Sequence, residues 1–260
     1  MSAALTLVQI TDCHLQNNPR HLYRNYDVES ALSRLLTDIL SSITDLDALL
    51  WTGDLVHHGG SDGYRRLQQR IAQLALPSYW IPGNHDDAEL MQQIGGSLNQ
   101  RSFCSDYWVV ILLDSSAMPD GKGSGSLAES ELRFLRQELE QYPDKHCLVV
   151  LHHNPLPVNS RWQDRIMLAN ALPFWDVVTS YPQVKAVLCG HVHQEWGLEH
   201  QGVQVLTTPA SSVQFKKCSD DMLLEDKPEL QGPAYRVLQL HPNGSITTSV
   251  KRIAVDGCND

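Results

Sequence analysis

The sequence predicts an α/β fold in which parallel strands alternate with helices. Two observations lead to this class. Short apolar runs alternate with longer segments whose apolar residues recur at helical spacing. Most of the short runs have Gly, Asp or Asn within the next three residues, and these residues suit the turns that end strands. A chain of 260 residues is long enough to bury a sizeable core around such strands.

The first third of the chain carries the clearest alternation. Apolar runs at 5–10, 48–51 and 78–81 predict three strands, and amphipathic segments at 27–42 and 61–75 predict the two helices between them. Strands that are separated by a crossover helix pair in parallel. We therefore expect the three strands to lie in one parallel sheet.

The middle third continues this pattern. Runs at 107–113, 147–151 and 184–189 predict three more strands, with a helical stretch between the last two. Ser126 and Glu129 have the spacing of a capping box, which predicts a helix running to about Glu140.

Beyond residue 193 the pattern changes to strands joined by short turns, which predicts antiparallel or mixed pairing. The expected strands lie at 203–208, 234–240 and 245–255. The stretches 114–125 and 214–233 read as irregular loops. No linker divides the chain, so we expect a single domain over residues 1–260.

Charge and composition exclude several classes of function. The formal net charge of −10 repels polyanions, so we expect no nucleic-acid partner. The sequence lacks an apolar run of about 18 residues and a signal-type start, so we expect no membrane partner and a cytoplasmic location. The six cysteines form no C-x-x-C pair and are expected to be reduced thiols: Cys13, Cys104, Cys147, Cys189, Cys218 and Cys258.

Side chains of the kinds that bind metals follow five of the expected strands. Each short motif alone is an ordinary turn, but five such turns at strand ends are hard to explain by chance. The carboxyl ends of parallel strands meet at one edge of a sheet, where sites form. We expect these side chains to converge: Asp12 and His14, Asp54, Asn84 and His85, His152 and His153, and His191 and His193.

The number and kind of these side chains predict two metal ions. Seven ligands are too many for one tetrahedral ion with an open position, but they suit two ions that share a bridging carboxylate. The seven are Asp12, His14, Asp54, Asn84, His152, His191 and His193. Mixed oxygen and imidazole donors favour Fe, Mn, Zn or Co and disfavour an all-oxygen calcium site.

The ordered motifs D-x-H, G-D, G-N-H-D, H and G-H-x-H resemble the calcineurin-like metallophosphoesterase superfamily. This resemblance implies a two-sheet α/β/β/α sandwich with the metals at the carboxyl edges of the sheets. It implies a first metal held by Asp12, His14, Asp54 and His193, and a second held by Asp54, Asn84, His152 and His191. His85 matches the catalytic histidine that contacts the phosphoryl oxygen or the leaving group. The residues implied to lie against the substrate are His14, Asp54, Asn84, His85 and His193.

The resemblance leaves a choice between two adjacent histidines. His152 comes first after its strand, where the ligand histidine of the superfamily lies, so we favour it. His153 then becomes a residue behind the ligands or in the pocket wall.

Within the superfamily, the overall layout is similar to the bacterial class III 3',5'-cyclic AMP phosphodiesterases. The similar segments include "VQITDCHL", "WIPGNHDD", "LHHNPLPV" and "VLCGHVHQEW". The resemblance implies hydrolysis of 3',5'-cyclic AMP to 5'-AMP by a hydroxide held between two metal ions. The alternative is a general phosphoesterase that acts on another small diester or a nucleotide.

Two features bear on the substrate and the assembly. The segment 207–215, "TTPASSVQF", resembles a stretch of the same family and is either a wall for the nucleotide or a plain strand and turn. The loop at 216–232 is acidic and departs from the family pattern, which puts the substrate preference in doubt. The sequence leaves the oligomeric state open.

Overall fold

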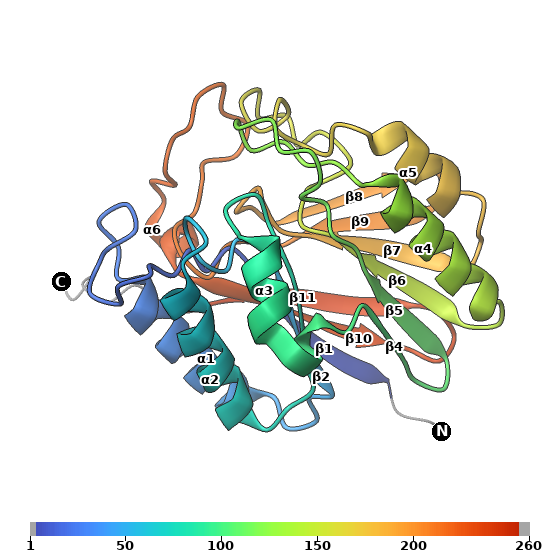
Figure 1. Ribbon diagram of the computed structural model, residues 1–260, viewed down its shortest axis with the longest axis horizontal. Helices are drawn as coiled ribbons and strands as arrows, with labels where there is room; N and C mark the ends of the chain where they lie inside the picture. Colours follow the sequence, from blue (N-terminus) through green and yellow to red (C-terminus); the bar gives the residue numbers. More distant parts are fainter. Residues whose placement is uncertain (1–3, 255–260) are drawn as a thin grey trace.

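The computed structural model describes residues 4–254, which form two β-sheets packed face to face (Figure 1). The first sheet has the strand order β11 (Ile246–Arg252), β10 (Ala234–Leu240), β1 (Leu5–Ile10), β2 (Ala48–Thr52) and β3 (Ser78–Ile81). The second has the order β4 (Ser102–Cys104), β5 (Trp108–Leu112), β6 (His146–Val150), β7 (Val184–Cys189), β9 (Val203–Thr207) and β8 (Trp196–His200).

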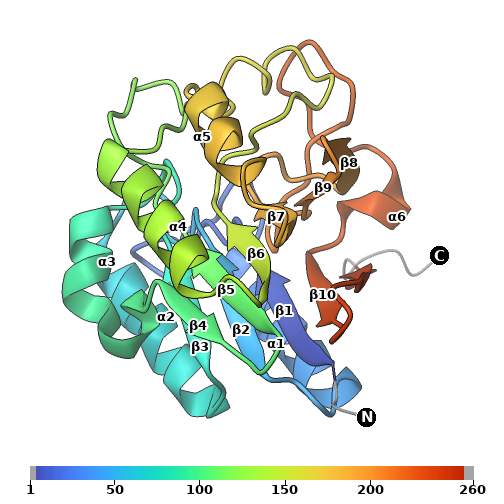
Figure 2. The same cartoon turned by 90° about the vertical axis from the view of Figure 1, so that its right-hand side faces the viewer.

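Helices cover the outer face of each sheet, which completes the expected α/β/β/α sandwich (Figures 1 and 2). The first sheet is covered by α1 (Val28–Ser42), α2 (Ser61–Leu74) and α3 (Ala88–Gly95), which runs into the 3-10 turn η1 (Gly96–Asn99). The second is covered by α4 (Glu129–Gln141) and α5 (Ala171–Val178). The short α6 (Pro228–Gln231) lies in the loop before β10. Among residues 4–254, no helix is long and apolar enough to cross a membrane.

Strand pairing follows the sequence pattern. β1, β2 and β3 pair in parallel, as do β5, β6, β7 and β9. The two C-terminal strands β10 and β11 add to the first sheet in antiparallel fashion, and β8 pairs antiparallel with β9. The expectation of mixed pairing beyond residue 193 is therefore confirmed.

An apolar layer joins the two sheets. Leu50 and Leu238 from the first sheet pack against Val110, Leu148 and Leu188 from the second, and all five are fully buried. Burying a side chain of this size contributes about 1.5–3 kcal/mol. Because both sheets contribute to this layer, it fixes the position of one set of strand ends relative to the other.

Three local expectations were wrong or incomplete. The proposed capping box is not formed: α4 begins at Glu129 after Ala128, and the Ser126 hydroxyl instead donates to the carbonyl oxygen of Ala117. The sequence did not predict α3, the short strands β4 and β8, or the short helix α6 inside the expected loop 214–233. The strand expected at 245–255 ends at Arg252. Residue 255, the last of the expected range, lies outside the described part of the chain, and so does Cys258.

The five ligand-bearing strand ends belong to two sheets. β1, β2 and β3 carry three of the clusters, and β6 and β7 carry the other two. The expectation that all five strand ends lie at the edge of one sheet is therefore wrong. The clusters still meet, because the packed sheets present these ends on the same side, away from the N-terminus (Figure 1).

Candidate dinuclear metal centre

Left-handed backbone turns aim the candidate ligands into the site. Asp12, His14, Asp54, His191 and His193 have φ values of 53°, 47°, 51°, 68° and 53°. Such values are uncommon for residues other than glycine and concentrate at functional sites. In extended backbone the side chains at i and i+2, such as those of Asp12 and His14, would point to the same side. The two side chains of each pair instead leave from tight turns.

The first cluster joins the end of β1 to the end of β7. Nε2 of His193 lies 3.2 Å from Oδ1 of Asp12, and Nε2 of His14 lies 3.2 Å from Nε2 of His193. Oδ2 of Asp54 is 3.7 Å from Nε2 of His14. All four side chains are buried. These are the residues expected at the first metal.

The second cluster shares Asp54 with the first. Nε2 of His152 lies 3.4 Å from Oδ2 of Asp54 and 3.9 Å from Oδ1 of Asp12. The rings of His152 and His191 are 5.2 Å apart between their centres. Asp54 therefore lies between the two groups, as a bridging ligand would. The two histidines that follow β7 belong to different groups, because His193 faces Asp12 and His191 faces His152.

Unpartnered buried atoms test whether metal ions fit here. Oδ1 of Asp12, Oδ1 of Asn84 and Nε2 of His152 are buried without a hydrogen-bond partner. An unsatisfied polar atom of this kind costs about 1–3 kcal/mol, and more when it is charged. All three are donor atoms that bind metal ions, so cations at the two clusters would satisfy them.

In three candidate histidine ligands, a backbone carbonyl group determines which ring nitrogen carries the proton. Nδ1 of His152 lies 2.8 Å from the Thr52 carbonyl, and Nδ1 of His193 lies 2.7 Å from that of Val213. Nε2 of His191 lies 3.0 Å from the Ile166 carbonyl oxygen. Since a carbonyl only accepts, each of these nitrogens donates, and the other nitrogen of each neutral ring keeps a lone pair. This is how metal-binding histidines are held.

The electrostatics of the site favour positive charge at its centre. Burial raises the pKa of Asp54, but nearby His152 and His14 outweigh burial and hold it well below its usual value. Burial lowers the pKa of His152, but Asp54 and Asp12 outweigh burial and raise it to about 9. Burial and the nearby His152 lower the pKa of His191 to about 3. The carboxylates of Asp54 and Asp12 thus stabilise positive charge at His152, whereas His191 stays neutral.

His153 contacts Ser115 and Gly125, and its Nε2 is buried without a hydrogen-bond partner. Its Nδ1 lies 2.8 Å from the Ser115 hydroxyl, and its ring packs beside Gly125, where a Cβ would overlap it. His152, by contrast, contacts both Asp12 and Asp54. This geometry favours His152 as the ligand, although His153 and His191 also lie close together.

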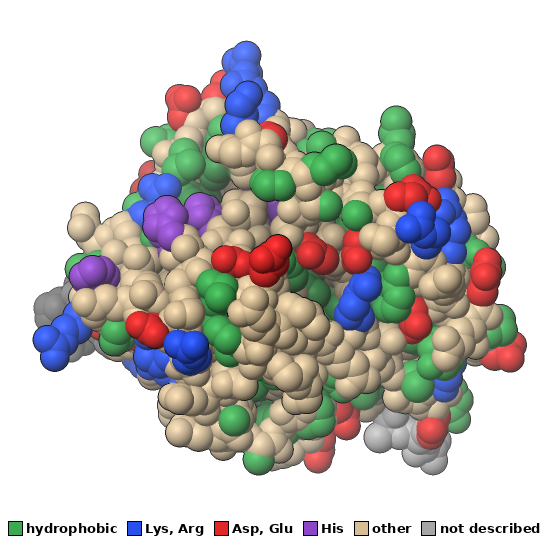
Figure 3. Space-filling model, viewed as in Figure 1, with side chains coloured by type: hydrophobic (Ala, Val, Ile, Leu, Met, Phe, Trp, Pro, Cys, Tyr) green, Lys and Arg blue, Asp and Glu red, His purple; other side chains and the backbone are tan. Residues whose placement is uncertain are grey.

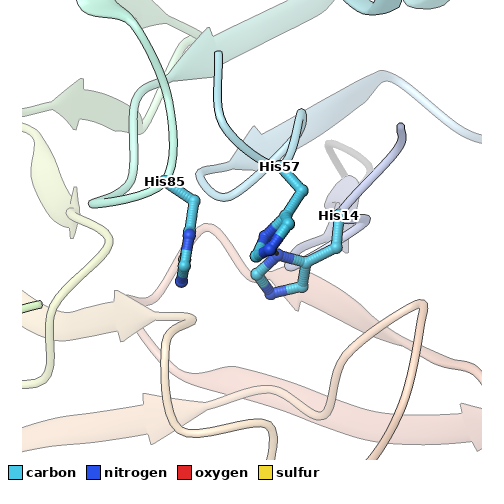
Figure 4. Close-up of side chains that lie close together, drawn as sticks. All are labelled: His14, His57 and His85. Atoms are coloured by element: carbon cyan, nitrogen blue, oxygen red, sulfur yellow. Dashed lines mark hydrogen bonds between the residues drawn. The ribbon is translucent and has the colours of Figure 1, made fainter. Parts of the chain in front are cut away.

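His85 lies at the mouth of the site. Its backbone N–H donates to Oδ1 of Asp54 at 2.9 Å, which ties its position to the shared carboxylate. Its ring lies 5.1 Å from that of His14 and 4.5 Å from that of His57 (Figure 4). Burial, partly offset by Asp54, lowers its pKa.

Asp86, which the sequence reading did not single out, holds the turn that carries Asn84 and His85. Its carboxylate accepts from the backbone N–H groups of Gly83, Leu55 and Val56 and from the hydroxyl of Tyr64. These bonds join the loops that follow β2 and β3. Gly83 lies so close to Asp54 and His152 that a Cβ there would overlap both side chains.

A cavity of about 530 Å³ opens over the two clusters of candidate ligands. On the face of the molecule drawn in Figure 3, histidine side chains gather at the left, beside basic side chains. Several lining residues were not predicted: Tyr23, Arg24, His57, Lys122, Trp162 and Met222. They come from loops, and no short motif marks them. The dipeptide His57–His58 after Asp54 is the one signal that could have been noticed.

The segment 207–215 is a structural wall of the site. Ser211 and Ser212 donate through their hydroxyls to the carbonyl oxygens of Thr11 and Asp12. Val213 accepts from His193, and Phe215 lines the cavity with its ring 4.5 Å from that of His193. The sequence left two interpretations of this segment open, a wall for the nucleotide or a plain strand and turn. These contacts do not fit a plain strand and turn.

Comparison with known proteins shows which family this chain belongs to. The sequence model of the calcineurin-like phosphoesterase family matches residues 5–195. The chain is 35% identical over 255 residues to the 3',5'-cyclic adenosine monophosphate phosphodiesterase CpdA of Vibrio vulnificus, covering 96% of this chain and 91% of that protein. It is also 35% identical over 257 residues to CpdA of Escherichia coli K12, covering 97% and 91%.

Among solved structures, the fold resembles a dimetal phosphatase from Danio rerio, with a TM-score of 0.64 at 14% identity. The match covers 92% of this chain and 94% of that one. Together, the family match and the near full-length identity show that this chain belongs to the calcineurin-like phosphoesterase family.

Proposed function

We propose that this protein is a metal-dependent phosphodiesterase that hydrolyses 3',5'-cyclic AMP to 5'-AMP. The observation that carries the proposal is the 35% identity to cyclic AMP phosphodiesterases over nearly the whole of both chains. The free thiols of the described cysteines suit the reducing cytoplasm, where we propose that it acts.

The proposed centre holds two ions. Asp12, His14, Asp54 and His193 bind the first, and Asp54, Asn84, His152 and His191 bind the second. The imidazole and carboxylate donors suit Fe, Mn, Zn or Co. When bound, the ions neutralise phosphate charge and supply an acidified water nucleophile.

His85 is proposed to act on the leaving group. In this hydrolysis the water oxygen bonds to phosphorus, and the bond from phosphorus to the 3' oxygen breaks. The attacking water gives up one proton and the departing 3' oxygen takes up one, so the protons balance. We assign the hydrogen bond to the 3' oxygen, and the delivery of its proton, to a ring nitrogen of His85. The bond from the His85 backbone N–H to Asp54 keeps the ring beside the clusters, where the phosphate would lie.

The aromatic part of the cavity wall is proposed to receive the nucleoside. Phe215 and Trp162 meet edge to face at 5.1 Å, and the Arg24 guanidinium lies 5.5 Å from the centre of the Phe215 ring. Both rings line the cavity together with Leu22 and Met222. Aromatic faces of this kind stack on bases, which contributes about 1–3 kcal/mol per base.

Phe215→Ala should therefore raise KM for cyclic AMP by roughly 5–150-fold, which corresponds to that stacking energy. Steady-state assays should show a smaller change with bis(p-nitrophenyl) phosphate, which has no base. Leu224→Ala, at an exposed apolar position of the same loop, is the control. Equal losses on both substrates would show that Phe215 supports the metal site rather than the base.

A substrate panel tests the function itself. The purified protein, loaded separately with Mn²⁺, Fe²⁺, Zn²⁺ or Co²⁺, is assayed with 3',5'-cyclic AMP, 3',5'-cyclic GMP, 2',3'-cyclic AMP and bis(p-nitrophenyl) phosphate. We expect the highest kcat/KM with 3',5'-cyclic AMP and 5'-AMP as its product. Equal or faster turnover of another diester would refute the cyclic AMP assignment and favour a general phosphoesterase.

A further inference from the structure

His57 contacts a proposed metal ligand but has no role in the site described so far. It is the third residue after Asp54, its ring lines the cavity, and it lies beside His14 and His85 (Figure 4). Its neighbour His58 is exposed, with its ring centre 4.0 Å from that of His57. The adjacent histidines therefore differ in environment, which provides a matched comparison.

The backbone brings His57 to His14. The His14 N–H donates to the carbonyl of Asp54 at 2.8 Å, and the Leu15 N–H donates to that of Leu55 at 3.0 Å. The His57 N–H returns a bond to the carbonyl of Leu15 at 2.9 Å. These three bonds pair the loop after β1 with the loop after β2, so the contact between the rings is built into the fold.

The two rings meet through their Nδ1 atoms, which are 3.2 Å apart. At this distance one nitrogen donates and the other accepts. On its other side, Nε2 of His14 lies 3.7 Å from Asp54 and 3.2 Å from Nε2 of His193. For Nε2 to bind a metal ion it needs its lone pair, which places the single proton of neutral His14 on Nδ1.

We propose that His57 is a positioning residue that accepts the Nδ1–H of His14 and so holds Nε2 of His14 toward the first metal. Tyr23 stacks on the face of His14, with ring centres 4.3 Å apart and an angle of 15° between the planes. Tyr23 thus fixes the plane of the ring, and His57 fixes its rotation and its proton. The other three candidate histidine ligands bond to backbone carbonyls, whereas His14 depends on a side chain. This inference rests on the proposed metal centre.

The same contact argues against a separate metal ion among His14, His57 and His85. Ligand atoms of these three rings lie within 4.8 Å of one another, so their spacing alone permits one. However, once Nε2 of His14 binds the first metal, Nδ1 holds a proton and has no lone pair to offer. The three rings are therefore better described as a hydrogen-bonded pair, His14 and His57, beside the proposed catalytic histidine His85.

Metal titration of three variants tests the proposal. His57→Leu removes the acceptor, His57→Gln keeps an accepting oxygen, and His58→Asn changes the exposed neighbour to a residue that tolerates its φ of 63°. Each metal-free protein is titrated with Zn²⁺ against a chromophoric chelator, and thermal unfolding confirms that each variant is folded.

We expect wild type to bind two ions per chain. In His57→Leu one of the two sites should weaken by about 10–100-fold, as is typical when a partner behind a metal ligand is lost. His57→Gln should recover most of that affinity, and His58→Asn should match wild type. ¹⁵N NMR of the Zn²⁺-loaded protein should place the His14 proton on Nδ1.

Four results would overturn the proposal. These are unchanged affinity in His57→Leu, an equal loss in His57→Leu and His57→Gln, an equal loss in His58→Asn, or a third Zn²⁺ that disappears in His57→Leu. The titration needs no substrate. Failure of cyclic AMP hydrolysis alone would therefore contradict the proposed function and leave the role of His57 standing.

Discussion

Asp54→Asn is expected to abolish cyclic AMP hydrolysis and to lower the metal content below two ions per chain. The substitution keeps the size of the side chain but removes its charge. Asp54 lies between the clusters, with Oδ2 3.7 Å from His14 and 3.4 Å from His152. A neutral amide cannot bridge two cations as a carboxylate does, so several kcal/mol of transition-state stabilisation should be lost. That corresponds to a fall of at least about 10³ in kcat/KM.

Two measurements check this expectation: kcat/KM for cyclic AMP, and the metal-to-protein ratio after dialysis. Asp62→Asn is the matched control, because Asp62 is exposed in the first turn of α2 and remote from the clusters. It should keep both ions and full activity. An Asp54→Asn protein that retained two ions and the wild-type rate would refute the proposed bridging role.

His85→Asn is expected to lower kcat for cyclic AMP by about 10²–10⁴, the usual contribution of a positioned proton donor. The metal content should stay at two ions, because His85 is not among the proposed ligands. The loss should be smaller with bis(p-nitrophenyl) phosphate, since p-nitrophenolate is a stable leaving group that needs little protonation. Steady-state kinetics on both substrates measure this difference.

His58→Asn is the control for His85 as well. The ring of His58 lies beside that of His85, with centres 6.3 Å apart, but His58 is exposed. It should leave both rates unchanged. Equal losses on the two substrates in His85→Asn would contradict leaving-group protonation. They would instead point to contact with the phosphoryl oxygen, the other role that the family resemblance implies.

The sequence predicted the strands and the candidate ligands because both depend on local pattern. Apolar runs such as those of β5 and β6 are buried along nearly their whole length, and ligand side chains follow directly after β1, β2 and β7. The proposed cap at Ser126 failed because a tertiary partner, the carbonyl of Ala117, took its hydroxyl. The short strand β4 has too few residues to show a period.

The cavity wall could not be predicted for a different reason. Arg24, Trp162 and Phe215 come from three loops that are far apart in the sequence, and they meet only because two sheets pack together. His57 is similar, because its contact with His14 depends on backbone pairing between two loops. Short-range patterns identify the proposed ligands, but not the side chains that hold them or that shape the space beside them.

The division of the proposed ligands between two sheets means that no early part of the chain carries the complete set. His193 follows His14 by 179 residues. At about 5–20 residues per second, synthesis of that interval takes roughly 10–35 s. During this time the emerging chain offers only partial ligand sets, and the ends of β6 and β7 that complete the clusters do not yet exist. A complete set of the proposed ligands therefore exists only after His193 has been made and the two sheets have packed together.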